Sequence, residues 1–349
     1  MKVGVVGDIH WSRYSSILRQ RGSTYSNRLE NCIKSVEWAE RVMDYQKCDV
    51  AIYLGDFFDS SELNSEELTA LTELTDKWSN KFTHYFLVGN HEMGIHDLSQ
   101  SSSHIFNMLN VPKVHGMEVV DKPLSIECDT VNLILLPYIL EDERKPLKEY
   151  IKFVGNNKRN IIFSHNDIAG IQMGKFKSQK GFSIEEIQEN CDLFLNGHIH
   201  NGEKVADKII NVGNLTGQNF SEDAMKYDHG IIILDTETLQ CEFYENPHAF
   251  NFYKFDLCNL DYDLNTLKTN SVVTAKVAPD EQEFYRDQFE NNPNIIAYRI
   301  ILAPSELNNA VSNNKEIISV NHLEKFSEYV LQNLGNDNVV KYELEEVLK

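Results

Sequence analysis

Paired cysteines of the Cys-x-x-Cys kind are absent from this chain. The six cysteines are spread over positions 32, 48, 128, 191, 241 and 258. Such scattered thiols, in or beside expected helices and strands, are typical of a protein that keeps its cysteines reduced. The sequence therefore predicts a cytosolic protein.

Long apolar runs are absent as well. No run approaches the ~20 residues that a membrane-spanning helix requires, and we expect no membrane contact. The first residues, Met1-Lys2-Val3, lead directly into an expected strand, which leaves no room for a signal peptide. With 349 residues, 42% of them hydrophobic and 25% charged, the chain is expected to form one large globular domain and a smaller one.

Positive charge is scarce, because 33 lysines and arginines face 53 acids and give a net charge of −20. A protein that binds nucleic acid over its whole surface is usually basic, since contacts with phosphates supply most of the affinity. The composition therefore favours either a small phosphate substrate or nucleic-acid contact through local basic patches, aided by a partner.

Two segments lack acids entirely and supply such patches. The first lies between Asp8 and Glu30, and the second runs from Ile168 to Ile184. Arginine among aromatic residues can pair phosphates and stack on bases, whereas the alternative interpretation is a solvated loop with counter-charges elsewhere. The basic residues proposed to contact DNA are Arg13, Arg19, Arg21, Lys175, Lys177 and Lys180.

Metal-ligating side chains follow five strand-like apolar runs. The run from Val50 to Leu54 ends in Gly55-Asp56-Phe57-Phe58-Asp59. Because the carboxyl ends of parallel strands meet at one edge of a sheet, ligands gather there. The other four runs end in Asp8-Ile9-His10, in Gly89-Asn90-His91-Glu92, in Ser164-His165 and in Gly197-His198-Ile199-His200.

The chemistry of these ligands indicates two metal ions. Imidazole, carboxylate and amide donors without thiolate suit Mn, Fe or Zn and disfavour a structural zinc site. Seven ligands, with His91 to spare, are too many for one ion and suit two ions that share a carboxylate. Such pairs lie roughly 3.5–4 Å apart and clamp both oxygens of a phosphoryl transfer.

In order and spacing, the motifs DIH, GDFFD, GNHE, SH and GHIH resemble the calcineurin-like metallophosphoesterase superfamily over roughly the first 235 residues. The resemblance implies a two-sheet α/β/β/α sandwich. It implies one metal held by Asp8, His10, Asp56 and His200, and a second held by Asp56, Asn90, His165 and His198, with Asp56 bridging. The metal is Mn by resemblance, and the ligand chemistry also permits Fe or Zn.

The resemblance also implies catalytic roles for His91 and Asp59. His91 would face the scissile phosphate and protonate the leaving oxygen, while a hydroxide activated by the metals attacks phosphorus. Asp59 would accept a hydrogen bond from the other ring nitrogen of His91 and set its tautomer.

Hydrophobic periodicity predicts the remaining elements. Helices are expected at 28–45, 61–78, around 102–109 and at 145–153, and strands near Val119 and at 133–136 as parts of the second sheet. A hairpin is expected over 229–244. Asn246-Pro247-His248 breaks the pattern, so the phosphoesterase domain is assigned to 1–247.

The following segment is predicted to contain a strand at 272–277, a helix at 280–289 and a strand at 295–302. This pattern resembles the smaller α+β capping domain of SbcD-type repair nucleases, and we assign it to 248–319. Those enzymes are DNA exonuclease or endonuclease subunits that work with an SMC-like, SbcC-type ATPase in recombination and repair, and bacteriophages carry a version. The resemblance implies DNA and that ATPase as partners, a homodimer as a further candidate, and a cytoplasmic location in a bacterium or phage-infected cell.

The last segment, 320–349, is predicted to be a helical tail. Leu323, Phe326, Val330 and Leu334 share one face of a helix expected at 322–334. By resemblance this face docks the ATPase subunit; the alternative is that it packs on the chain's own cap.

Three other functions are less compatible with the sequence. Ser/Thr protein phosphatases carry Asp-Arg-Gly where this chain has Asp59-Ser60-Ser61, so the arginine that grips a phosphate monoester is missing. Small-molecule or cyclic-nucleotide phosphodiesterases lack a hundred-residue tail. A non-catalytic scaffold would be expected to have lost a ligand, and all seven are present.

Overall fold

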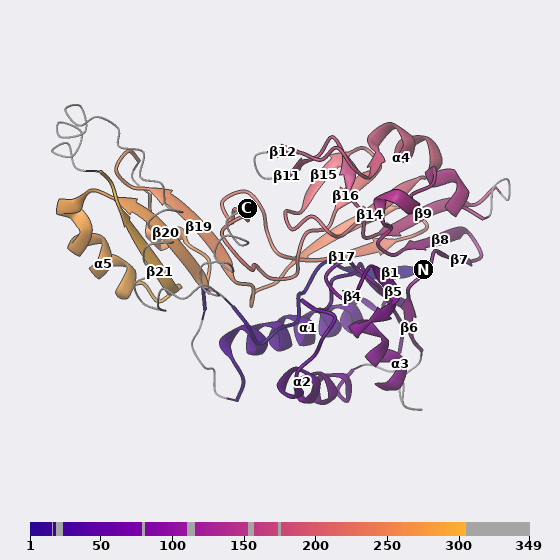
Figure 1. The fold of residues 1–349 in the computed structure, drawn as a ribbon, viewed down its shortest axis with the longest axis horizontal. Coiled ribbons are helices and arrows are strands. Elements are labelled where there is room, and N and C mark those ends of the chain that lie inside the picture. The colour runs from indigo at the N-terminus through magenta and orange to yellow at the C-terminus, as the bar shows by residue number, and fades with distance from the viewer. Residues whose placement is uncertain are drawn as a thin grey trace, which may run out of the picture. The chain divides into compact units, whose positions relative to one another are not determined.

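The computed structural model describes residues 1–15, 17–18, 24–78, 81–109, 116–152, 157–173, 176–260 and 262–304. The first sheet has six strands in the order β18-β17-β1-β2-β3-β6. Figure 1 labels β17, β1 and β6 of this sheet. Four of them run parallel: β1 (Lys2–Val6), β2 (Val50–Tyr53), β3 (Thr83–Leu87) and β6 (Met117–Val120). The antiparallel hairpin of β17 (Gly230–Asp235) and β18 (Gln240–Glu245) extends the sheet beyond β1, as the sequence predicts.

The second sheet also has six strands, in the order β15-β16-β14-β9-β8-β7. Its parallel centre consists of β8 (Val131–Leu136), β9 (Arg159–Ser164), β14 (Leu193–Asn196) and β16 (Ile209–Asn211). The edge strands β7 (Leu124–Glu127) and β15 (Glu203–Ala206) pair antiparallel. All residues of β8 are buried, as expected for a strand covered on both faces.

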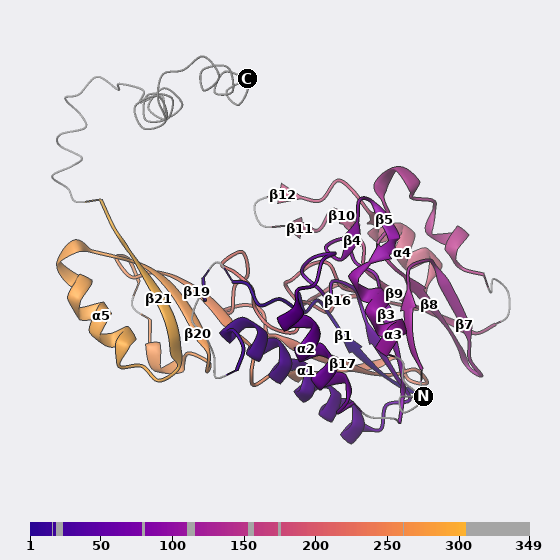
Figure 2. The same cartoon turned by 60° about the horizontal axis from the view of Figure 1, so that its bottom comes forward.

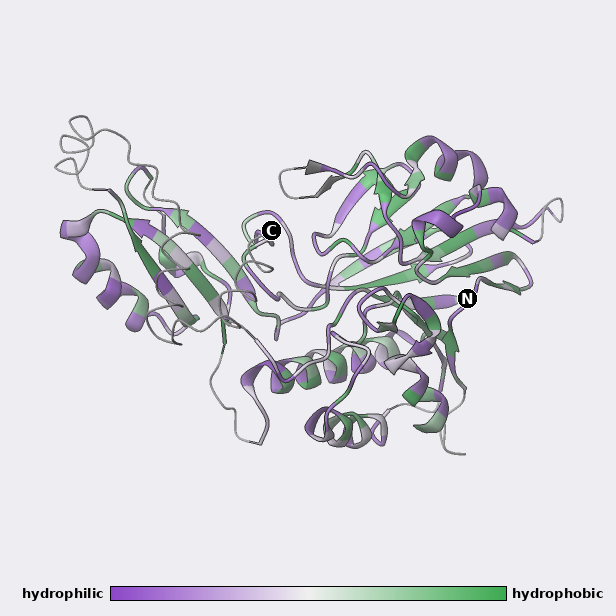
Figure 3. Ribbon diagram, in the orientation of Figure 1, coloured by the Kyte–Doolittle hydropathy of each residue, from purple (hydrophilic) through white to green (hydrophobic). Residues whose placement is uncertain are grey.

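The two sheets pack face to face on an apolar layer. Val5 and Ile52 of the first sheet belong to the same buried cluster as Leu135, Phe163 and Leu195 of the second. Figure 3 shows the strands of both sheets as mainly hydrophobic. This layer holds the carboxyl ends of both parallel strand sets in fixed positions.

Helices cover the two outer faces (Figure 2). The first sheet is covered by α1 (Asn27–Gln46), α2 (Ser65–Thr75) and α3 (Ile105–Leu109). The second is covered by α4 (Ile184–Asn190) and a 3-10 turn over Leu147–Tyr150. The layers therefore confirm the expected α/β/β/α sandwich.

Three local expectations are wrong. The strand at Val119 is β6 and belongs to the first sheet, not the second. Of the segment expected as a helix over 145–153, the described residues 145–152 form only the 3-10 turn, whose N-terminal Pro146 gives no side-chain cap. The second helix begins at Ser65, not Ser61, because Asn64 and Glu67 form a capping box.

A smaller three-stranded sheet follows, in the order β19-β20-β21. Its strands are β19 (Asn251–Asp256), β20 (Ser271–Val277) and β21 (Ile295–Leu302), and α5 (Gln282–Glu290) contributes Phe289 to their core. The predicted strand, helix and strand are confirmed, and β19 is an addition. Residues 1–277 and 281–301 form one compact unit. The boundary at 247 stays a prediction, and the tail at 320–349 lies outside the described residues.

Short pairs of strands decorate the loops. They are β4 (Met93–Gly94) with β5 (Asp97–Ser101), β10 (Ile168–Ala169) with β13 (Phe182–Ser183), and β11 (Gln172–Met173) with β12 (Phe176–Lys177). Within the described ranges, none of the helices has the length and apolar character needed to cross a membrane.

Candidate metal centre

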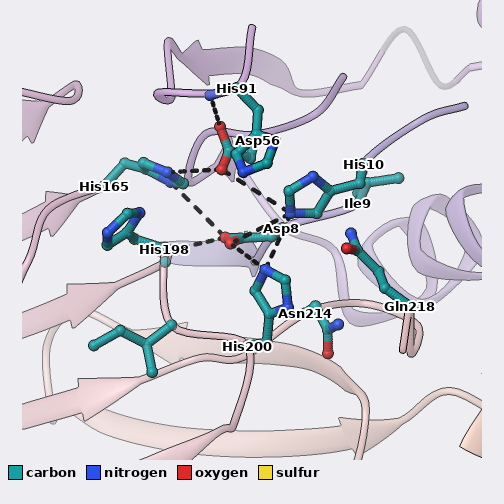
Figure 4. A network of polar contacts seen from close by, with 12 residues as sticks. Asp8, Ile9, His10, Asp56, His91, His165, His198, His200, Asn214 and Gln218 are labelled. Atoms are coloured by element: carbon teal, nitrogen blue, oxygen red, sulfur yellow. Dashed lines mark hydrogen bonds and ion pairs between the residues drawn. The ribbon is translucent and has the colours of Figure 1, made fainter. Parts of the chain in front are cut away.

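The loops that follow β1, β2, β3, β9 and β14 bring the predicted ligands into one cluster (Figure 4). Three of these strands belong to the first sheet and two to the second. The carboxyl ends of both parallel sets therefore meet at the same end of the sandwich, where ligands of open α/β sheets bind. The site therefore requires residues from several loops that are far apart in the sequence.

Three of the predicted ligands have left-handed backbone conformations. The φ angles are 50° at His10, 47° at Asp56 and 69° at His198. Non-glycine residues adopt this region at an energetic cost, and such residues cluster at functional sites. Part of the conformation is fixed locally, because the Asp56 carbonyl accepts hydrogen bonds from the amides of Ile9 and His10 at 3.1 and 2.9 Å.

Two glycines let these ligands approach one another. Gly55 has a φ of 104°, and a Cβ there would lie 2.5 Å from Nδ1 of His165. A Cβ at Gly89 would lie 2.2 Å from Oδ1 of Asp56. The glycines of the GDFFD and GNHE motifs are therefore required by packing against the ligands.

Asp8, His10 and His200 form one cluster of ligand atoms. Nε2 of His10 lies 4.0 Å from Oδ2 of Asp8 and 3.2 Å from Nε2 of His200, and the latter lies 3.9 Å from the same oxygen. Asp8 is fully buried, and its Oδ2 has no hydrogen-bond partner among the described residues. An orphaned buried carboxylate oxygen facing two imidazoles fits a cation-binding position.

Asp56, His165 and His198 form the second cluster. Nε2 of His165 lies 3.2 Å from Oδ2 of Asp56 and 3.1 Å from Oδ1 of Asn90. The same Asp56 oxygen is 4.0 Å from Nε2 of His10, in the first cluster. Asp56 thus lies between the two clusters, where a bridging carboxylate is expected, and the assignment of ligands to ions stays a prediction.

An oxygen acceptor faces the outer nitrogen of each of the four histidines. Nδ1 of His10 lies 3.1 Å from Asp59, Nδ1 of His200 lies 3.1 Å from Glu222, Nδ1 of His165 lies 2.8 Å from the Leu54 carbonyl, and Nε2 of His198 lies 3.4 Å from Asp167. An acceptor on one ring nitrogen assigns the proton to that nitrogen and leaves the other as a metal ligand.

This pairing has a consequence for His10 and His200. When both rings are neutral and carry the proton on Nδ1, two Nε2 lone pairs face each other 3.2 Å apart. A divalent cation between them would relieve their repulsion, and imidazole nitrogen with carboxylate oxygen is a donor set for Mn, Fe or Zn. The residues present therefore fit a dimetal centre.

The pKa shifts within the cluster follow the same contacts. Burial opposes the charge of Asp56, but the imidazoles of His165, His10 and His91 hold the pKa of this carboxyl well below its usual range. Burial lowers the pKa of His165, but Asp56 and Asp8 more than compensate and raise it to about 9. Burial prevails at His10 and lowers its pKa despite the hydrogen bond with Asp59.

His91 lies at the open side of the cluster. Its side chain is 46% exposed, its ring meets that of His10 edge to face at 4.7 Å, and its amide donates to Asp56 at 2.9 Å. Asp59 is closer to His10, at 3.1 Å, than to Nδ1 of His91, at 3.9 Å. A ligand atom of His91 also lies near those of His10 and Asp56, so its role as acid and not ligand stays a prediction.

Two acidic residues of the site were missed by the sequence reasoning. Glu222 bonds His200, and Asp167 bonds His198. Burial raises the pKa of Glu222, but the His200 hydrogen bond and His229 lower it overall; the His198 hydrogen bond lowers the pKa of Asp167. Asp167 lies two residues beyond His165, which was a signal, whereas Glu222 lies in a stretch without any motif.

The proposed DNA contacts are described only in part. Arg13 is exposed and lies 3.5 Å from Glu66, so a counter-charge is present. Lys177 and Lys180 are exposed, and Arg19, Arg21 and Lys175 lie outside the described residues. The nearby Arg28 is buried and donates to the carbonyls of Ile9, His10 and Gly217, so it supports the loop.

A hollow of about 180 Å³ opens beside the first cluster. It is lined by His10, Tyr14, Ser15, Arg28, Asp59, Gln218 and Asn219. Neutral polar side chains dominate the wall away from His10 and Asp59. The first acid-free loop, through Tyr14 and Ser15, therefore reaches the site itself.

Comparison with known proteins agrees with this geometry. The family model of the calcineurin-like phosphoesterases matches residues 1–202. Exonuclease subunit 1 of Enterobacteria phage T4 is 22% identical over 250 residues, which cover 70% of this chain and 69% of that protein.

Two solved structures are also similar to this chain. A novel archaeal phosphodiesterase is 16% identical over 70% of this chain and 99% of its own, with a TM-score of 0.35. A dimetal phosphatase from Danio rerio is 13% identical over 67% of this chain and 91% of its own, with a TM-score of 0.39.

Proposed function

Since this chain belongs to the calcineurin-like phosphoesterase family of phosphoester hydrolases with a dimetal centre, we propose that it is a Mn-dependent DNA phosphodiesterase. The observation that carries the proposal is the position of Asp56 between two histidine-rich clusters at one end of the sandwich. We further propose that the chain is the nuclease subunit of an SbcC/SbcD-type recombination and repair complex.

The ligands would hold two divalent ions in the arrangement implied by the resemblance. Asp8, His10 and His200 would hold one, Asn90, His165 and His198 the other, and Asp56 both. When bound, such ions supply positive charge that stabilises the phosphoryl oxygens and makes water acidic enough to be a nucleophile near neutral pH. The identity as Mn rests on the resemblance, and the same donors suit Fe or Zn.

His91 is proposed to be the general acid. Its exposed ring at the open side of the cluster can reach a phosphate that approaches from solvent. Protonating the leaving oxygen lowers the barrier to bond cleavage. General acid–base catalysis of this kind typically raises the rate 10²–10⁴-fold. Asp59, beside both His10 and His91, is proposed to orient the two rings.

DNA as substrate rests on two supports. The T4 relative is named an exonuclease subunit, and the sheet of β19 to β21 with α5 has the pattern expected of a nuclease cap. Because the T4 relative is named a subunit, we also propose that this chain has a partner, an SMC-like ATPase. The proposed docking segment, 320–349, lies outside the described residues.

A small phosphodiester is the second candidate substrate. The net charge of −20 and the pairing of Arg13 with Glu66 favour it, because both weaken attraction to a polyanion. A cyclic-nucleotide phosphodiesterase would share all the metal ligands, so the site geometry does not distinguish the two.

One assay separates these functions. The protein with Mn²⁺ is given end-labelled linear duplex DNA, a small chromogenic phosphodiester and a phosphopeptide, and His91→Ala serves as the inactive control. We expect DNA to be digested and the phosphopeptide to remain intact. Hydrolysis of the small phosphodiester without digestion of DNA would establish the second candidate instead.

A further inference from the structure

Glu222 lies outside the sequence motifs and contacts His200 of the candidate metal centre. It lies in the connection between β16 and β17 and is 2% exposed. Burying a carboxylate is costly unless hydrogen-bond donors surround it. Its contacts therefore indicate why an acid is kept at this position.

Donors surround both oxygens of Glu222. Oε1 lies 3.1 Å from Nδ1 of His200 and accepts from Nδ2 of Asn214 at 2.9 Å. The amide of Gln218 donates to Oε2 at 2.9 Å and to Oε1 at 3.2 Å. Nε2 of His229 lies 4.0 Å from Oε2. The carboxylate thus has a fixed orientation, and its Oε1 faces the ring of His200.

The main chain on both sides of Glu222 is also fixed. The amide of Gly217 donates to the Phe250 carbonyl, and that of Ala224 donates to the Phe252 carbonyl, both at 3.1 Å. The segment that carries Glu222 is therefore hydrogen-bonded to the segment of β19. Because these hydrogen bonds already fix its position, the Glu222 carboxylate loses little conformational entropy when it orients a second side chain.

The adjacent Asp223 provides a contrast. It lies 3.1 Å from Lys226 and its side chain is 37% exposed. Its carboxylate caps the amide of Met225 at 3.1 Å. The two neighbouring acids therefore differ in burial, and only Glu222 contacts His200.

A carboxylate accepts hydrogen bonds and cannot donate them, so it places the His200 proton on Nδ1. Nε2 is then the unprotonated nitrogen, and it lies 3.2 Å from Nε2 of His10 and 3.9 Å from Oδ2 of Asp8. We propose that Glu222 is a positioning residue that holds His200 ready to bind the metal ion shared with Asp8 and His10. This inference rests on the proposed metal-dependent function and goes beyond it by assigning a role to Glu222.

The test measures binding of Mn²⁺ itself, by equilibrium titration of the metal-free protein. We expect Glu222→Gln to lower the affinity for one of the two ions by 10- to 100-fold, the usual effect of losing a hydrogen-bond partner of a metal ligand. The affinity for the other ion should be unchanged. Glu222→Ala should weaken the same ion at least as much. Asp223→Asn is the matched control, and it should bind both ions as the wild type does.

A double-mutant cycle distinguishes positioning from general support of the fold. If Glu222 acts through His200, then Glu222→Gln should cause no further loss of affinity in a His200→Asn background. Thermal unfolding of each metal-free variant shows that it is folded, and Glu222→Gln carries the test if Glu222→Ala does not fold. Equal weakening of both ions, unchanged affinity, or the same loss without His200 would overturn the proposal.

The outcome for DNA is separate. Wild-type protein that binds two ions without cutting DNA would refute the proposed nuclease function and leave the role of Glu222 intact. Normal cutting by wild type, with Mn²⁺ affinities in Glu222→Gln like those of wild type, would refute the role of Glu222 alone.

Discussion

A histidine at this site is defined by what lies on each of its two nitrogens. His10 and His200 have a carboxylate on Nδ1 and face each other through Nε2. His91 differs because its ring is half exposed and no carboxylate lies within hydrogen-bond distance of Nδ1 among the described residues. These contacts distinguish His91, the predicted proton donor, from the predicted ligands His10 and His200.

At the residue scale, His91 and Asp56 should fail in different ways. His91→Ala is expected to keep both metal ions and to lose hydrolysis by 10²-fold or more, since it removes only a proton donor. Asp56→Ala should lose metal as well, because this carboxylate lies between both clusters. Metal analysis of the purified variants together with a phosphodiester assay checks this. Loss of metal from His91→Ala would show that His91 is a ligand.

The sequence identifies the residues that follow buried strands, but it does not identify their partners. Asp8, Asp56 and His165 could be predicted because each ends an apolar run, and parallel strands place such ends together. Glu222 could not, because it contacts His200 across a connection whose path depends on hydrogen bonds to β19. The spacing of apolar residues predicts helices, strands and strand ends, whereas the contact between Glu222 and His200 depends on the tertiary structure.

At the scale of the element, helix ends show where sequence patterns fail. Apolar spacing places Leu71 and Leu74 on the buried face of α2 but does not fix its first residue. The side chain of Asn64 decides it, because it accepts from the amides of Glu66 and Glu67 while Glu67 reaches back to the amide of Asn64.

Replacing the capping residue should therefore destabilise the protein measurably. Asn64→Ala is expected to lower the free energy of unfolding by about 1 kcal/mol, because two amides of the first turn lose their acceptor. Ser61→Ala is the control, since Ser61 is exposed and precedes the helix. Denaturant unfolding of both variants checks the difference. A larger effect at Ser61 than at Asn64 would mean that the helix begins earlier.

At the scale of the whole molecule, the cysteines differ in burial and therefore in expected reactivity. Cys258 is exposed, whereas Cys48 and Cys191 are buried and burial raises the pKa of each thiol to about 12. Thiolates are the reactive species, so a raised pKa and poor access both slow reaction. At pH 8 we expect a disulfide reagent to label Cys258 first and Cys48 and Cys191 only after unfolding. Mass spectrometry of labelled peptides checks the order, and early labelling of Cys191 would contradict the burial of this side chain.

Charge at the metal centre links the site to global stability. Asp8 and Asp56 are 0% and 1% exposed, and Oδ2 of Asp8 has no hydrogen-bond partner within the described residues. A buried carboxylate without full compensation costs stability. An ion that binds only the folded chain restores it by RT ln(1 + [L]/Kd), which is about 2.7 kcal/mol at one hundred times Kd.

Mn²⁺ should therefore raise the melting temperature of the wild type by about 5 °C for each ion bound at such a concentration, taking about 2 °C for each kcal/mol in a chain of this size. A chelator should reverse the shift. Asp56→Asn is expected to lose most of the response, because this side chain contributes to both clusters. Its metal-free melting temperature should fall below that of wild type, because the substitution removes the carboxylate that compensates the buried imidazole of His165. Scanning calorimetry of both proteins with and without Mn²⁺ measures this. An equal shift in Asp56→Asn would mean that Mn²⁺ binds elsewhere, on the acidic surface of a chain with net charge −20.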